Sequence, residues 1–265
     1  MHSQITPVII TYDEAKNIER CLSRLSWAQD IVLVDSFSRD DTLEIAGQFR
    51  NVRVYQREFD DFARQWRFAL EHTEISTEWV LALDADYILM QGLIEELGVL
   101  APASGTNAYR ATFKYCICGR PVFGSLYQPV TILFRRQSGH FIQQGHAYRL
   151  RVSGETAPLK NSVFHDDRKP LSRWLTTQAQ YAQQEAEYID ATEWTKLRLT
   201  GKIRALRFPA PFLVFFISLF WKGAILSGPR GLLYAFQRML SEVMIVIALL
   251  NFRKTEKVQK RSDLE

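Results

Sequence analysis

The 265-residue sequence has few cysteines and lacks several common signatures. Its three cysteines are Cys21, Cys116 and Cys118, and they form no C-x-x-C pair. We therefore expect free thiols in a reducing compartment and no disulfide framework. The N-terminus lacks the basic segment and the long apolar run of a signal peptide, and we expect the body of the chain to stay in the cytoplasm. No G-x-G-x-x-G follows the first expected strand, which argues against a Rossmann dehydrogenase.

The composition is that of a folded protein with an uneven charge. Hydrophobic residues make up 47% of the chain and charged residues 23%, which excludes disorder as the explanation of the sequence. From Lys196 onward there are 13 Lys/Arg against 4 Asp/Glu, whereas the residues before it hold 20 against 25. An acidic body with a basic tail is typical of proteins that meet nucleic acid or an anionic membrane.

Short apolar runs alternate with helical stripes in the first third of the chain. The expected strands are 7–11, 31–35, 52–55 and 79–83, and the expected helices are 18–25, 42–49 and 62–70. This alternation predicts an α/β fold in which a parallel sheet is covered on both faces. Ligands bind at the carboxyl ends of such strands, where the sequence has Thr11-Tyr12, Asp35-Ser36 and Asp84-Ala85-Asp86.

The middle of the chain has a different pattern. Residues 108–152 alternate, are rich in aromatic side chains and are interrupted by Gly and Pro, which predicts β-structure and loops inserted after the nucleotide-binding half. Residues 171–194 then read as one long helix.

Asp84 and Asp86 follow an apolar strand directly. Carboxylates two residues apart on an extended segment project to the same side, and together they can hold Mg²⁺ or Mn²⁺ while leaving positions for a diphosphate. The alternative is that Asp84 caps the next turn and Asp86 is solvated.

Asp35 ends the second strand and begins a cluster that runs to Thr42. An acidic residue at the end of a buried strand needs a partner, and the edge of a nucleobase can supply one. Ser38, Asp40 and Asp41 also fit a role in capping the following helix.

Three motifs together resemble a known family. Residues 10–18 (ITYDEAKNI), 34–38 (VDSFS) and 83–86 (LDAD) resemble family 2 glycosyltransferases with the GT-A fold, and most of all the bacterial branch that builds lipopolysaccharide core and exopolysaccharide. The resemblance covers about residues 5–190. It implies an inverting transfer of sugar from a nucleotide-sugar, with a UDP-linked donor and a divalent cation.

The resemblance also implies roles for individual residues. Asp35 would bind a uracil-like base, and Asp84 the donor ribose or sugar. Asp86 and the later His165 would bind the metal. The nucleotide pocket would be lined by Thr11, Tyr12, Glu14 and Ser36.

The chain departs from the family pattern at Asp13, Tyr87 and Ala147, where relatives commonly have Asn, Glu and Glu. The last of these leaves the catalytic base open. The candidates are His146, Asp166 and Asp167, of which we place His146 first. An inverting transfer needs such a group to take the proton of the acceptor hydroxyl.

The tail holds two apolar runs, 209–226 and 232–250. The first is near the lower limit for a membrane span, and the second has Arg238 and Glu242 near its centre, where charge is costly in lipid. We therefore expect two interfacial helices on an anionic membrane surface, or else a soluble hairpin or a dimer interface. No aromatic stacking platform accompanies the basic residues, so nucleic acid is not expected as a partner.

These expectations divide the chain into a GT-A catalytic domain (1–200) and a basic helical tail (201–265). Within the domain, 1–107 would bind the nucleotide and 108–200 the acceptor, a glycan or lipid-linked molecule. The enzyme would work at the cytoplasmic face of the membrane. A different class of function also fits the departures at Tyr87 and Ala147, namely a catalytically inactive GT-A domain that acts as a membrane-bound binding or assembly subunit.

Overall fold

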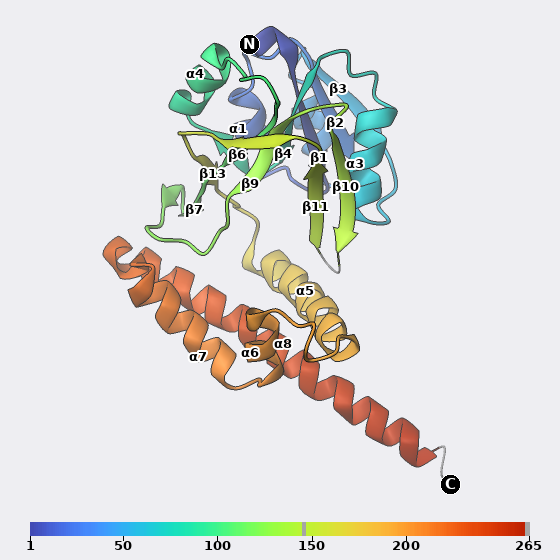
Figure 1. The fold of residues 1–265 in the computed structure, drawn as a ribbon, viewed down its shortest axis with the longest axis vertical. Coiled ribbons are helices and arrows are strands. Elements are labelled where there is room, and N and C mark those ends of the chain that lie inside the picture. Colours follow the sequence, from blue (N-terminus) through green and yellow to red (C-terminus); the bar gives the residue numbers. More distant parts are fainter. Residues whose placement is uncertain (145–146, 263–265) are drawn as a thin grey trace. The chain divides into compact units, whose positions relative to one another are not determined.

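The computed structural model describes residues 1–144 and 147–262, and the chain folds into two compact units (Figure 1). The first unit comprises Met1–Pro121 and Tyr127–Lys169, and the second comprises Val122–Leu126 and Pro170–Glu265. Packing thus assigns the helix that follows Lys169 to the second unit, whereas the sequence placed the boundary at residue 200. The functional division at residue 200 stays a prediction.

A seven-stranded sheet is the centre of the first unit. Its strands, in order across the sheet, are β12 (Glu155–Pro158), β6 (Thr106–Ala111), β9 (Val130–Arg135), β4 (Trp79–Asp84), β1 (Ile5–Thr11), β2 (Ile31–Asp35) and β3 (Val52–Gln56). β9 runs antiparallel to both its neighbours, and the other pairs are parallel. The four strands expected from the apolar runs are all present, and the sheet is mixed because β9 enters it in the opposite direction.

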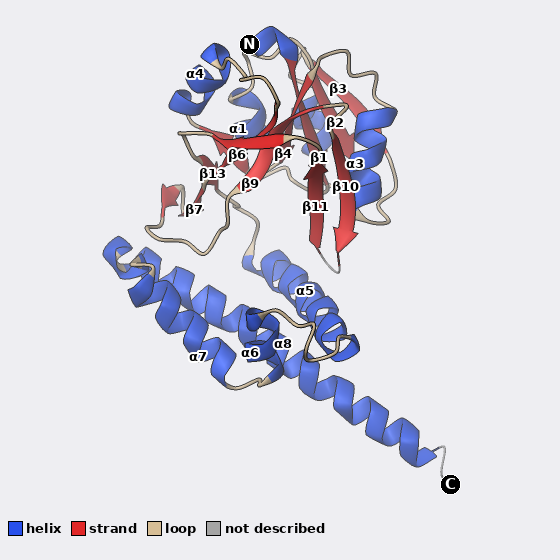
Figure 2. Cartoon of the chain, viewed as in Figure 1, coloured by secondary structure: helices blue, strands red, loops and turns tan. Residues whose placement is uncertain are grey.

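Helices cover both faces of this sheet (Figure 2). They are α1 (Ile18–Ser23), α2 (Thr42–Ala46), α3 (Phe62–Glu71) and α4 (Gln91–Val99). One core joins α1, α2 and α4 to one face of the sheet. A second core packs α3 and the hairpin strand β10 on the other face, through Trp66 stacked on Phe141 at 4.8 Å. Strands buried from both sides explain why these segments read as nearly continuous apolar runs.

The part of the chain after β4 forms two smaller sheets. A hairpin pairs β10 (Gly139–Gln144) with β11 (Ala147–Val152). The second sheet has the strand order β5 (Tyr87–Leu89), β13 (Val163–His165), β7 (Phe113–Ile117) and β8 (Arg120–Pro121). The β-rich character predicted for residues 108–152 is therefore correct. The pairing of β13 with β5 brings His165 opposite Tyr87.

The second unit is helical. It contains α5 (Leu171–Ala191), α6 (Leu199–Ala205), α7 (Pro209–Phe216), a π-helical turn η2 (Ile217–Trp221), a 3₁₀ turn η3 (Ala224–Ser227) and α8 (Pro229–Ser262). A small apolar core of α5 and α8 residues holds the unit together. Among the described residues, Pro229–Asn251 of α8 is long and apolar enough to cross a membrane, and Pro209–Trp221 is a shorter apolar helical segment.

Candidate active site

The carboxyl ends of β1, β2 and β4 lie together. Thr11 pairs with Asp35, and Ile10 pairs with Asp84, in the parallel register of these strands. The three clusters that the sequence placed at strand ends therefore do share one edge of the sheet. Loops and the strand β13 add the remaining groups.

The loops after β1 and β2 are tied to each other by hydrogen bonds from backbone N–H groups. Asp13 N donates to Ser38 Oγ at 2.8 Å, and Arg39 N donates to Asp13 Oδ1 at 2.7 Å. Glu14 N donates to Thr42 Oγ1 at 2.7 Å. These contacts give Ser38 and Thr42 roles in loop structure and fix the shape of the Thr11–Glu14 segment.

Asp35 is fully buried at the end of β2. Its carboxylate accepts hydrogen bonds from the hydroxyl of Ser38, from Ser38 N at 2.9 Å and from Gln56 Nε2 at 3.3 Å. Ser36 Oγ accepts a hydrogen bond from Gln65 Nε2 at 3.1 Å. The partner that a buried Asp35 requires is thus supplied in part by the protein itself.

Two aromatic side chains stand exposed beside this edge. Tyr12 is 42% exposed and Phe37 is 52% exposed. Phe37 has φ 59°, a conformation that costs energy in a bulky residue and that clusters at functional sites. Sequence analysis did not identify Phe37, because a backbone conformation leaves no pattern in a single sequence.

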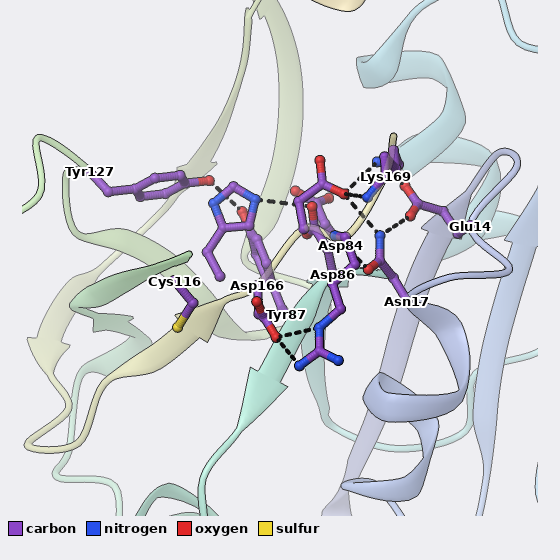
Figure 3. A network of polar contacts seen from close by, with 12 residues as sticks. Glu14, Asn17, Asp84, Asp86, Tyr87, Cys116, Tyr127, Asp166 and Lys169 are labelled. Carbon is purple, nitrogen blue, oxygen red and sulfur yellow. Dashed lines mark hydrogen bonds and ion pairs between the residues drawn. The ribbon is translucent and has the colours of Figure 1, made fainter. Parts of the chain in front are cut away.

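Asp86, which is labelled in Figure 3, forms the centre of the site together with His165. Asp86 Oδ2 lies 3.0 Å from His165 Nε2, and both side chains are largely buried. The structure therefore brings together two residues that are far apart in sequence and that were predicted to share a metal. Burial opposes the charge on Asp86, but His165 and Lys169 hold its pKa below the ordinary value.

Asp84 is the second acidic group of this centre. Burial, followed by the charge of Asp86, raises the pKa of Asp84 to about 6. Burial opposes the charge on His165, but the charge and hydrogen bond of Asp86, together with the charges of Asp84 and Asp167, raise its pKa above the ordinary value. The protonation of each of these three side chains therefore depends on the charges of its neighbours.

Three tyrosines surround the imidazole of His165. Tyr87, Tyr115 and Tyr127 all pack edge-on to it, with centroid distances of 5.0–5.5 Å. The hydroxyls of Tyr87 and Tyr127 are 2.8 Å apart (Figure 3). Tyr87, which looked like a departure from the family pattern, thus orients His165.

Lys169 is the cation of the site that sequence analysis missed. Its Nζ lies 2.6 Å from Glu14 Oε1 and 3.8 Å from Asp167 Oδ1, and only 18% of its side chain is exposed. Burial raises the pKa of Glu14 to about 7 even with this ion pair in place. The run of charged residues after His165 gave no means of telling Lys169 from a solvated lysine.

Asn17 links the first helix to the segment after β13. Its side-chain amide donates to Glu14 Oε2 at 2.8 Å and to Asp167 Oδ1 at 3.0 Å. Its carbonyl oxygen accepts from Arg20 Nη2 at 2.6 Å and from Arg168 N at 3.0 Å. Asn17 is fully buried. Its side chain therefore links the loop after β1 and the start of α1 to the segment after β13.

The two carboxylates that follow His165 differ in their surroundings. Asp166 accepts from Arg20 Nη1 at 2.5 Å, from Arg168 Nε at 3.1 Å and from Gly119 N at 3.2 Å. Both contacts of Asp167 with Asn17 and Lys169 fall on Oδ1, and its Oδ2 has no partner within the described part of the chain. Asp166 is therefore a structural anchor, while Asp167 keeps an oxygen available. His146 lies outside the described residues.

Two polar atoms at this centre are buried without a partner. Asp86 Oδ1 and His165 Nδ1 have no hydrogen-bond partner among the described residues, while Asp86 Oδ2 and His165 Nε2 are hydrogen-bonded to each other. A carboxylate oxygen and an imidazole nitrogen are atoms that could ligate a divalent cation. Among the described residues, no group of three or more His, Cys, Asp or Glu side chains is placed to hold a metal ion.

Comparison with known proteins identifies the family. Residues 6–146, more than half of the chain, match the family described as Glycosyl transferase family 2. The chain belongs to this family. The mixed sheet flanked by helices is accordingly its GT-A fold, and the predictions of the family, the fold and an enzyme of the transferase class are confirmed.

The curated relatives of this glycosyltransferase differ in how much of the chain they cover. The glycosyltransferase SunS of Bacillus subtilis is 34% identical over 85 residues, which are 31% of this chain and 20% of SunS. The chain thus spans about a fifth of that relative. An uncharacterized glycosyltransferase of Rickettsia felis is 23% identical over 277 residues, covering 98% of this chain and 94% of the relative.

Two solved structures show a similar course of the chain at low sequence identity. TarS residues 1–349 of S. aureus, in complex with UDP-GlcNAc, has 14% identity and a TM-score of 0.49, with coverage of 95% of this chain and 92% of that one. Glucosyl-3-phosphoglycerate synthase of Mycobacterium tuberculosis, in complex with Mn²⁺, UDP and phosphoglyceric acid, has 16% identity and a TM-score of 0.47, with coverage of 71% and 78%.

Proposed function

We propose that the chain is an inverting, divalent-cation-dependent glycosyltransferase that uses a UDP-sugar. The observation that carries this proposal is the buried pair of Asp86 and His165 at the carboxyl edge of the sheet, with unpaired atoms on both side chains.

The donor nucleotide would occupy the ends of β1 and β2. Asp35 has two carboxylate oxygens and about four acceptor sites, so its contacts to Ser38 and Gln56 leave room for the N–H of a uracil-like base. Phe37 and Tyr12 are exposed at this edge and would stack on the ring faces of the base. Thr11 Oγ1, which is buried and has no partner among the described residues, would bind the ribose together with Ser36 and Asp84.

Mg²⁺ or Mn²⁺ would be held by Asp86 and His165. Such ions are commonly bound by one or two protein ligands plus phosphate oxygens and water, which fits a site without a complete protein cage. When bound, the ion supplies charge stabilisation to the departing diphosphate. Lys169 would add a second positive charge on the same side, because its ion pair with Glu14 lies beside Asp86.

The protein's own part in the reaction is to position the acceptor and accept its proton. An acceptor hydroxyl oxygen attacks the anomeric carbon, the bond from that carbon to the phosphate oxygen breaks, and the hydroxyl proton passes to a base. Asp167 and His146 are the base candidates. Asp166 is a poor one, since its lone pairs are used by Arg20, Arg168 and Gly119 and protonation would break those contacts.

The acceptor we propose is a lipid-linked or lipopolysaccharide/exopolysaccharide glycan at the cytoplasmic face of the membrane. The apolar helices of the second unit and the basic charge of the tail support this location. A homo-oligomer would be compatible with the same exposed surface.

A catalytically inactive domain that only binds nucleotide is the second candidate, and the Glu-to-Ala departure at position 147 favours it. Release of UDP from a panel of UDP-sugars in Mn²⁺ separates the two. We expect slow release by the wild-type chain, with water as the acceptor, and none by Asp86→Ala. Loss of the true base, tested with Asp167→Asn and His146→Ala, should lower the rate by about 10²–10⁴-fold without changing UDP affinity. Binding of UDP without release from any donor would support the inactive domain instead.

A further inference from the structure

A buried ion cluster joins three helices of the second unit. The guanidinium of Arg204 in α6 contacts Glu185 of α5, with Nη1 to Oε1 at 2.7 Å, and Glu242 of α8, with Nη2 to Oε1 at 2.5 Å and Nε to Oε2 at 2.9 Å. The side chains of Glu185 and Glu242 are only 12% and 7% exposed. Removing Arg204 would leave two buried carboxylates without their ion pair, so this guanidinium links α8 to α5 and α6.

One member of this cluster lies in the segment that, among the described residues, is long and apolar enough to cross a membrane. Glu242 belongs to Pro229–Asn251 of α8, and the neighbouring Ser241 donates to Gln178 of α5 at 2.8 Å. If α8 crossed a bilayer, Glu242 would either lose Arg204 or carry α5 and α6 into the lipid. Much of α5 is polar and exposed, at Ser172, Thr176, Gln180, Gln183, Gln184, Glu187 and Asp190. Such a helix cannot enter hydrocarbon.

A row of apolar side chains along α7 and η2 of the second unit is exposed. Phe208, Phe212, Phe216 and Phe220 recur at every fourth residue along α7 and η2, each 55–68% exposed. Trp221, at the end of this row, is 85% exposed. We call these five residues the aromatic ridge. Residues four apart lie on one side of a helix, so the ridge is a continuous strip.

The charge around the ridge is of one sign. Residues 194–241 contain eight Lys/Arg and no Asp or Glu. Lys222 follows the ridge directly, and Arg207 precedes it. Aromatic side chains with flanking cations are the composition of helices that lie in the interface of an anionic membrane.

We infer that the aromatic ridge inserts into one leaflet of an anionic bilayer while α8 lies along the surface and does not cross. The inference rests on the proposed membrane location and specifies its geometry. The Glu185–Arg204–Glu242 cluster faces away from lipid and keeps the polar helix α5 out of it. A lipid-linked acceptor would then reach the protein from the leaflet that the ridge enters.

Vesicle flotation of the purified full chain tests the insertion. We expect the wild-type chain to float with phosphatidylglycerol vesicles and less with phosphatidylcholine vesicles. The variant Phe212→Glu/Phe216→Glu/Phe220→Glu should float at least tenfold less. The matched control Phe59→Glu/Val99→Glu, at exposed apolar positions of the first unit, should float like the wild type. Equal flotation of ridge variant and wild type, or no flotation of the wild type, would overturn the inference.

Labelling with a membrane-impermeant maleimide tests whether α8 crosses. In a Cys118→Ser background, Ser227→Cys and Ser262→Cys report on the two ends of α8. Neither should react in intact cells, and Ser262→Cys should react after permeabilisation. Reaction of either cysteine in intact cells would show a crossing helix and overturn the inference.

The outcomes separate this inference from the proposed function. UDP release by a wild-type chain that does not float would end the inference and leave the active site in place. A ridge variant that loses flotation and keeps UDP release supports both. If the ridge variant turns a non-floating dimer into a monomer, the ridge is an interface between copies of the chain.

Discussion

At the scale of single residues, Asp84 is a carboxylate whose pKa lies well above its ordinary value. Burial and Asp86 raise its pKa from 3.8 to about 6. The folded protein therefore binds this proton more tightly than the unfolded chain. Its contribution to stability is complete below about pH 4 and is lost as the pH rises through 6. A bound cation would relieve this penalty by pairing the charge.

We therefore expect the free energy of unfolding, measured in EDTA, to fall between pH 4.5 and 7.5. Asp84→Asn should reduce this fall because it removes one of the groups that must ionise. The substitution should not abolish the fall in stability, since the pKa of Glu14 is also raised by burial, to about 7. The measurement is urea denaturation at several pH values, with Asp190→Asn on the exposed side of α5 as the control. Parallel pH curves for Asp84→Asn and the wild type would contradict the assigned pKa.

Some residues of the site could be proposed from the sequence, and others could not. Asp35, Asp84, Asp86 and His165 could be proposed because acidic residues after apolar strands, and a late histidine, form a recognisable order. Lys169, Asn17 and Phe37 could not. Their significance depends on burial, on contacts across the sheet and on a backbone angle, none of which a single sequence encodes locally.

At the scale of elements, the amide of Asn17, at the start of α1, is one of the links between α1 and the segment that follows β13. Asn17→Ala removes hydrogen bonds to Glu14, Asp167, Arg20 and Arg168. Buried groups left without partners cost about 1–3 kcal/mol. We expect a loss of stability in this range and a slower release of UDP, because Asp167 is no longer held.

Thermal unfolding and the UDP-release rate of Asn17→Ala check this expectation. Asn161→Ala is the matched control, because Asn161 also donates to a carboxylate, that of Glu96, but at an exposed position. If both variants lose the same stability and both keep full activity, Asn17 is not the link between the two elements.

The order of elements was predictable to a large extent. The strands that became β1, β2, β3 and β4 were identified from continuous apolar runs, which arise because both faces of the sheet are covered. The antiparallel β9 and the small sheet around β13 were predicted only as β-structure. Their pairing depends on contacts between distant segments, and alternating sequence does not specify the partner strand.

At the scale of the whole molecule, we propose that the first unit binds the nucleotide-sugar and carries out the transfer, and that the second unit contacts the membrane. The family covers residues 6–146, so the function of the C-terminal helices depends on their own sequence and structure. The sequence indicated their apolar and basic character. It could not show that Glu242, an apparent obstacle to membrane contact, is buried against Arg204 on the side of α8 that meets α5 and α6.

The central claim is that a nucleotide is held through a divalent cation at Asp86 and His165. Isothermal titration of UDP into the full chain, with Mn²⁺ and with EDTA, tests it most directly. We expect UDP to bind in the presence of Mn²⁺ and its affinity to fall by about 100-fold or more in EDTA. Asp86→Asn should show the same loss of UDP affinity in Mn²⁺. Asp190→Asn should bind UDP like the wild type. UDP affinity that is the same with and without Mn²⁺, and unchanged in Asp86→Asn, would contradict it.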